Sequence, residues 1–172
     1  MKNTILIQQD NESTGSISFN RLKLLCSLGK NGITKNKMEG DGATPSGIYP
    51  LRKILYRNDR VHLSRVALET NPINKYDGWC DQPNDINYNS KITLPYSSSA
   101  ESLWRNDCRY DIIIVIGYND KPIIHGKGSA IFIHITDNYL KPTDGCIAVK
   151  LEDMLSIIKE CNFKTICKIS NE

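Results

Sequence analysis

The feature of this sequence that most limits its fold is the shortness of its apolar runs. The longest is the Ile-Ile-Ile-Val-Ile run at residues 112–116, and polar and turn-forming residues flank it. Such a run is long enough for a buried strand, whereas a membrane-spanning helix needs about 20 apolar residues. We therefore expect a mainly β chain without an integral membrane segment.

Alternating and β-branched segments predict strands along much of the chain. Residues 151–159 carry apolar side chains at the spacing of an amphipathic helix, so a helix is expected late in the sequence. One or two further helical turns are expected within residues 99–105. The predicted strands are 4–8, a hairpin over 15–28, 48–56, 110–117, 130–135, 146–149 and 164–169.

Residues 57–108 show little periodicity and are rich in Asn, Asp, Pro and Ser. Long irregular segments of this kind commonly form lids or binding loops. A chain of 172 residues has the size of one domain and needs no disulfide or metal to fold. The sequence thus predicts a single sandwich-like β domain over residues 1–172, with a long loop insertion and a late amphipathic helix.

The charge pattern gives no sign of a nucleic-acid partner. The formal net charge is +3 and the basic residues are scattered, whereas nucleic-acid-binding domains gather them on one face. The first ten residues are too poor in apolar side chains for a signal peptide and lack a small-residue cleavage site. The sequence alone therefore leaves open both a cytoplasmic location and export by another route.

The six cysteines show no CxxC spacing, which argues against a zinc site. Cys26, Cys161 and Cys167 lie in apolar surroundings and are expected to be small buried residues. Cys80 and Cys108 flank most of the insertion. A disulfide between them would stabilise the fold by roughly 3–4 kcal/mol, and two free thiols are the alternative.

The turn at residues 142–145 leads directly into a predicted strand that begins with Cys146. A cysteine nucleophile needs exposure, a base and donors that stabilise an oxyanion. Gly145 allows close backbone approach or a positive φ, and Cys146 would stand where backbone N–H groups are still unpaired. Cys146 is therefore a candidate nucleophile, and a buried structural thiol is the alternative.

His134 is the candidate base. It ends a predicted strand twelve positions before Cys146, and a loop between two adjacent strands would bring the two residues together. Because side chains alternate along a strand, His134 shares a face with Phe132 and Ala130. The alternative is a hydrogen-bonded structural histidine. His62 and His125 lie in predicted loops and show no partner in the sequence.

The stretch 124–149 resembles the catalytic motif of the YkuD-type L,D-transpeptidases, in a divergent, proteobacterial-like branch. That family carries a histidine on one strand and a Ser/Thr-x-Gly-Cys segment that enters the next. The matching positions are His134, Thr143, Gly145 and Cys146. The glycine-rich segment 39–47 resembles the family's Thr-Pro-x-Gly turn, and the resemblance extends over residues 15–160. Further similar segments are 77–81, 110–111, 117–119 and 126–131.

The resemblance implies an L,D-transpeptidase that needs no cofactor. Cys146 would attack a peptidoglycan stem peptide, D-alanine would leave, and an amine would resolve the thioester as a 3–3 cross-link. His134 would be the base, oriented by the carbonyl of Ile135, and the N–H groups of Gly145 and Cys146 would hold the oxyanion. Members of the family act in the periplasm or cell envelope, and carbapenems acylate their cysteine.

This sequence departs from the family pattern at two positions. Asp144 stands where many members have His, and its negative charge should oppose thiolate formation. Ala148 stands where many have an Arg assigned to the substrate carboxylate or to site structure, so Arg105 or Arg109 would have to take over that role. Trp79 follows a turn and would either line a substrate groove or cover the core.

Two other functions therefore stay open. With water as the acceptor, the same Cys-His site would make the protein an L,D-carboxypeptidase or another amide hydrolase. Alternatively, the domain would be a non-catalytic cell-wall binding module. The sequence does not fix the acceptor, the exact stem peptide or the oligomeric state.

Overall fold

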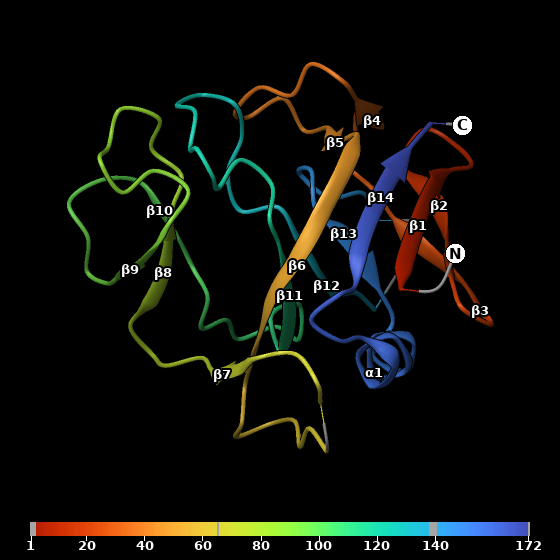
Figure 1. Cartoon of the computed structure of the whole chain (residues 1–172). Coiled ribbons are helices and arrows are strands. Elements are labelled where there is room, and N and C mark those ends of the chain that lie inside the picture. Colours follow the sequence, from red (N-terminus) through yellow and green to blue (C-terminus); the bar gives the residue numbers. More distant parts are fainter. Residues whose placement is uncertain (1–2, 65, 138–140, 172) are drawn as a thin grey trace.

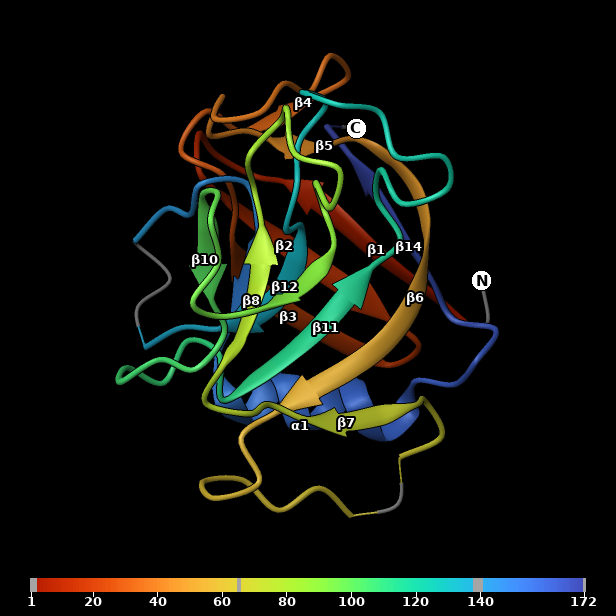
Figure 2. The same ribbon diagram turned by 90° about the vertical axis from the view of Figure 1, so that its left-hand side faces the viewer.

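A large sheet that closes on itself organises this protein. The computed structural model describes residues 3–64, 66–137 and 141–171. Nine strands follow the order β11-β12-β13-β3-β2-β1-β14-β6-β7, and β6 also pairs with β11, which completes a ring (Figures 1 and 2). These elements are β1 (Thr4–Gln9), β2 (Thr14–Phe19), β3 (Leu22–Ser27), β6 (Gly47–Tyr56), β7 (Thr70–Pro72), β11 (Ile112–Ile116), β12 (Phe132–Ile135), β13 (Ile147–Val149) and β14 (Ile166–Ser170).

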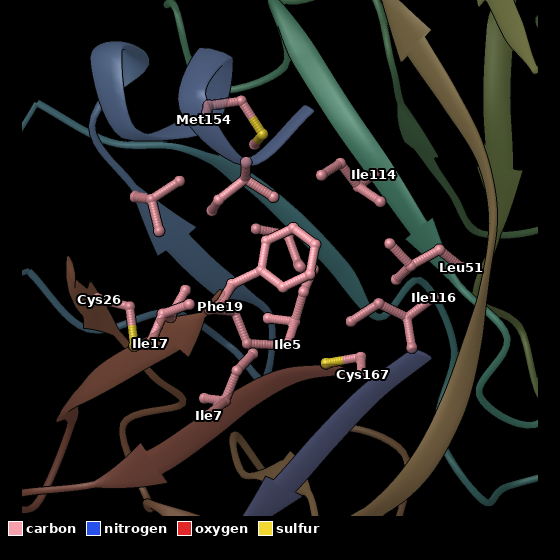
Figure 3. Packing of buried hydrophobic residues seen from close by; sticks show 14 of the residues in the cluster. Ile5, Ile7, Ile17, Phe19, Cys26, Leu51, Ile114, Ile116, Met154 and Cys167 are labelled. Carbon is pink, nitrogen blue, oxygen red and sulfur yellow. The ribbon is translucent and has the colours of Figure 1, made fainter. Parts of the chain in front are cut away.

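Aliphatic side chains fill the interior of this ring. In Figure 3, Phe19 lies among Ile5, Ile17 and Ile114, and Met154 reaches the same cluster from α1 (Leu151–Glu160). The helix packs against β12 and β3 through its apolar stripe. Burial of an Ile side chain stabilises a fold by about 1.5–3 kcal/mol, so this cluster is the main source of stability.

The mainly β prediction is confirmed, and so are the strands and the late helix within a few residues. The helical turns predicted within 99–105 are wrong, because that segment contains a strand, β10 (Ala100–Ser102). Backbone pairing with β8 (Asp77–Cys80) imposes the extended conformation there, and this long-range pairing leaves no trace in local sequence periodicity.

The insertion is also more regular than its composition indicates. Within it, β10, β8 and β9 (Lys91–Thr93) form a separate three-stranded sheet, visible beside the main sheet at the left of Figure 1. A second apolar cluster joins the two sheets, with Trp79 from β8 packed edge-on against Phe132 from β12 at 5.0 Å between ring centroids. The remaining short strands, β4 (Ile33–Thr34) and β5 (Thr44–Pro45), pair with each other.

The cysteines follow the prediction in part. Cys26, Cys161 and Cys167 are buried, as expected. The possible disulfide between Cys80 and Cys108 is not formed. Cys80 is a buried free thiol on β8, and Cys108 is an exposed free thiol. In the described part of the chain, no helix is long and apolar enough to cross a membrane.

Candidate active site

A cavity of about 420 Å³ lies where the small sheet meets β12 and β13. Cys146 and His134 both line it. The strands β12 and β13 run parallel, with Ile133 opposite Ile147 and His134 opposite Ala148. Cys146 directly precedes β13, so this register makes it a diagonal neighbour of His134 on the same face of the sheet.

The predicted turn before β13 is held by Thr143. Its hydroxyl donates to the carbonyl of Cys146 at 2.6 Å and accepts the N–H of Gly145 at 3.2 Å. The Thr143 backbone bonds in turn to residues 28 and 30. A threonine at this position thus fixes the turn from within, which explains the Thr-x-Gly-Cys spacing.

Gly145 is required by both its conformation and its surroundings. Its φ is +133°, which side chains rarely allow, and a Cβ there would lie 2.8 Å from the carbonyl oxygen of Ala43. Ala43 belongs to the glycine-rich upstream turn, and the hydroxyl of the next residue, Thr44, accepts the N–H of Gly29 at 2.9 Å. The two motifs that the resemblance singled out are therefore in contact.

The Cys146 thiol is held by backbone groups of the segment that enters β12. It donates to the carbonyl of Ala130 at 3.0 Å and accepts the N–H of Phe132 at 3.4 Å. Ala130 has φ +52°, a costly conformation for a residue with a side chain. Its N–H donates at 3.0 Å to Oδ1 of buried Asn89, which also receives the indole N–H of Trp79 at 2.9 Å.

His134 is buried, and its ring orientation is fixed. Nδ1 lies 2.9 Å from the carbonyl oxygen of Ile135. Because a carbonyl only accepts, Nδ1 carries the proton and Nε2 presents a lone pair. The N–H of Ile135 donates to the carbonyl of Arg109 at 3.0 Å, which anchors the strand end. This is the geometry predicted for a histidine base.

At rest, both partners are neutral. Burial raises the pKa of the Cys146 thiol to about 12, and the negative charge of Glu101 adds to this effect. Burial lowers the pKa of His134 to about 4. The arrangement can therefore act as a thiol and a neutral imidazole base, rather than as a thiolate–imidazolium pair formed in advance.

Tyr110 and Glu101 are among the residues of the site that sequence reasoning missed. The ring of Tyr110 stands edge-on to that of His134 with centroids 5.5 Å apart, and its hydroxyl donates to Glu101 at 2.7 Å. Both line the cavity. Tyr110 was visible only as part of a short resembling segment, and Glu101 was hidden in the segment wrongly expected to be helical.

The other predicted residues fall into two groups. Asp144, Arg105 and Arg109 line the cavity, and Ala148 does so beside His134. Asp144 is exposed and pairs with Lys30 at 2.9 Å. The structure favours the core interpretation of Trp79, which is 8% exposed and does not belong to the cavity wall.

The remaining histidines lie outside this site. Nδ1 of His125 contacts the carbonyl of Pro83, and its ring stacks on Tyr88. His62 is exposed in the insertion. Over residues 3–64, 66–137 and 141–171, no cluster of three or more His, Cys, Asp or Glu side chains could hold a metal ion.

Comparison with one solved structure supports the fold. The structure of Bdellovibrio bacteriovorus Bd1075 aligns with 99% of this chain and 49% of its own, at 16% identity and a TM-score of 0.51. Mycobacterium tuberculosis L,D-transpeptidase 1 aligns with 98% of this chain and 60% of its own, at 9% identity and a TM-score of 0.42. This chain thus spans about half to three fifths of these proteins. A search of curated proteins found no match.

The profile of the L,D-transpeptidase catalytic domain, YkuD, matches residues 3–169. The match includes the upstream glycine-rich turn, β12 with His134, and the Thr143–Cys146 turn. Together they place the chain in a family defined by its catalytic domain. This protein belongs to the YkuD family of L,D-transpeptidase catalytic domains.

Proposed function

We propose that this protein is a cysteine acyltransferase that forms L,D-cross-links between peptidoglycan stem peptides through a thioester on Cys146. One observation carries the proposal. Cys146 and His134 line one cavity from adjacent strands, and the Nδ1–H of His134 is committed to Ile135, which leaves Nε2 as the basic atom. A thiol beside an oriented neutral imidazole is the arrangement that nucleophilic catalysis requires.

Acylation begins with the thiol proton. At rest this proton points to the Ala130 carbonyl, so the thiol must rotate toward Nε2 of His134 before attack. Because the thiol pKa is high and the imidazole is neutral, proton transfer accompanies attack on the donor carbonyl. The imidazolium then protonates the amine of the departing D-alanine, which leaves the acyl group on sulfur.

Backbone donors would stabilise the tetrahedral intermediate. The N–H of Gly145 already donates to Thr143, which leaves the N–H of Cys146 as the better candidate of the two predicted oxyanion donors. An amine from a second stem would then attack the thioester and give a 3–3 cross-link. The activity of the family in the cell wall supports a location in the periplasm or cell envelope.

A second candidate uses the same site with water as acceptor. The cavity wall is rich in charged and hydroxyl groups, so water has access to the thioester. The protein would then be an L,D-carboxypeptidase. A non-catalytic binding module is disfavoured, because such a module needs no buried, oriented histidine beside a thiol.

Purified disaccharide-free tetrapeptide stems provide the test, with products followed by liquid chromatography and mass spectrometry. We expect wild type to release D-alanine and form peptide dimers, and Cys146→Ala to do neither. Tripeptide without dimers would favour the carboxypeptidase. Equal turnover by Cys146→Ala would overturn both enzymatic candidates.

A further inference from the structure

The cavity wall that faces Cys146 and His134 carries two carboxylates from the small sheet. In the pairing of β10 with β8, Glu101 lies opposite Trp79 and Ala100 opposite Cys80, so Asp81 follows one step along. Alternation puts Glu101, Trp79 and Asp81 on one face. Trp79 packs on Phe132, so this face is turned toward β12, and both carboxylates line the cavity.

The carboxylate of Glu101 is held in a fixed orientation, but no cation among the described residues lies within hydrogen-bond distance to neutralise its negative charge. Its Oε1 accepts the hydroxyl of Tyr110 at 2.7 Å, and Nη1 of Arg105 lies 3.8 Å away. That arginine makes its short bonds to Asp107 instead, at 2.8 and 2.7 Å. Among the described residues, no hydrogen bond reaches the second oxygen of Glu101. The carboxylate is therefore held in one place with acceptor capacity to spare.

Asp81 supplies an independent sign of a missing partner. Its Oδ1 is buried and has no hydrogen-bond partner in the described part of the chain. A buried carboxylate oxygen without a partner is costly and rare in native structures. The other two acidic residues of the cavity do have partners, since Glu39 receives the Ser129 hydroxyl at 2.7 Å and Asp144 pairs with Lys30.

We propose that Glu101 and Asp81 bind the ammonium group of the acyl acceptor and hold it beside the thioester on Cys146. The proposal rests on the proposed function and names the chemistry of its second substrate: a primary amine rather than water. A primary ammonium has three N–H donors; the second oxygen of Glu101 can accept one of them, and the negative charge of Asp81 on the same wall adds to the attraction. Charge-assisted bonds of this kind are the strong ones.

The same carboxylates provide a route for the acceptor proton. The ammonium gives one proton to the Glu101 carboxylate and becomes a neutral amine. The amine nitrogen attacks the thioester carbon, the new C–N bond forms and the C–S bond breaks. The attacking nitrogen then loses a second proton, which passes through His134 to the Cys146 sulfur and restores the thiol. Glu101 releases the proton that it took from the ammonium to solvent.

The position of Glu101 favours the acceptor over a distant part of the donor. Glu101 lines the same cavity as Cys146, and the ring of Tyr110, whose hydroxyl Glu101 accepts, stands edge-on to His134. An attacking nitrogen must come within about 3–3.5 Å of the thioester carbon. A carboxylate fixed on this wall can therefore hold an ammonium inside the cavity that contains the acyl group on Cys146.

The test separates acceptor binding from acylation. Wild type, Glu101→Gln and Asp81→Asn are acylated with a tetrapeptide donor and offered Nα-acetyllysine amide, a primary ammonium without a carboxylate. In parallel, they are offered hydroxylamine, which is uncharged at neutral pH. Gln at position 101 still accepts the Tyr110 hydroxyl, while the negative charge and the second acceptor oxygen are lost. Exposed Glu69, changed to Gln, is the matched control.

We expect Glu101→Gln to lower the ratio of aminolysis to hydrolysis with the lysine amide at least about tenfold, and Asp81→Asn to lower it less. In both variants, hydroxylamine should trap the acyl-enzyme at the wild-type rate, and acylation by a carbapenem should be no slower than in wild type. An unchanged ratio, or an equal fall with hydroxylamine, would overturn the inference alone. Wild type that forms no acyl-enzyme would instead overturn the proposed function, and the inference with it.

Discussion

The two faces of β12 show how one strand serves both stability and chemistry. Ile133 and Ile135 point into the closed sheet, where they join the aliphatic cluster of Figure 3. Phe132 and His134 point the other way, toward the small sheet and the cavity. The cluster on the first face consists of apolar side chains, whereas hydrogen bonds made by Tyr110, Asn89 and Cys146 lie on the side of the second face.

The two faces contribute different properties to the site. The aliphatic face fixes the register of β12 against β11 and β13, because a slip of one residue would turn every Ile toward the cavity. The same register fixes His134 opposite Ala148 on the second face. Precision at the site therefore depends on a core that contributes no chemistry.

A change on the cavity face of β12 should reduce the rate of the chemistry most strongly. Changing His134→Gln should slow acylation of Cys146 by about 10²–10⁴-fold, because the thiol loses its base. Measurement of the acylation rate by mass spectrometry, beside the unfolding transition, checks this. A slowdown of less than about tenfold in a folded variant would show that another group takes the proton.

The opposite face should respond in stability instead. Changing Ile133→Ala removes a fully buried side chain from the aliphatic cluster and should lower the free energy of unfolding by about 2–5 kcal/mol. Below its melting temperature, the variant should keep most of its acylation rate. Urea denaturation and acylation rates on the same sample test this, and exposed Leu25→Ala is the control.

The buried neutral histidine predicts a pH dependence of stability. The pKa of folded His134 is about 4, below the ordinary value of 6.5, so the unfolded chain takes up the proton first as the pH falls. Wild type should thus lose up to about 3 kcal/mol between pH 6.5 and 4 relative to His134→Gln. Parallel denaturation curves at several pH values measure this difference, and identical pH profiles would contradict it.

A smaller loss of acylation rate is expected from a change in the turn that precedes β13. Changing Thr143→Val removes the hydroxyl that bridges Gly145 and Cys146, and should slow acylation about tenfold. Thr143→Ser keeps the hydroxyl and should stay close to wild type. If Val and Ser variants behaved alike, the turn would be held by backbone contacts alone.

The sequence could reveal those parts of the fold that depend on local pattern. Alternation placed β12 and put His134 with Phe132 on one face, and the amphipathic stripe placed α1. It could not reveal β8 to β10, because their pairing joins segments that show little periodicity. Cys146 and His134 stood out through motif spacing, whereas Glu101, Tyr110 and Asn89 reach the site through long-range contacts that one sequence does not display.

Intact-protein mass spectrometry after incubation with a carbapenem shows whether Cys146 is an accessible, activated nucleophile. We predict one covalent adduct on wild type, a much slower adduct on His134→Gln and none on Cys146→Ala, with circular dichroism confirming that all three are folded. Cys108 remains in every sample as an exposed internal control thiol. An adduct on Cys146→Ala, or none on folded wild type, would contradict the assignment of Cys146 as the activated nucleophile.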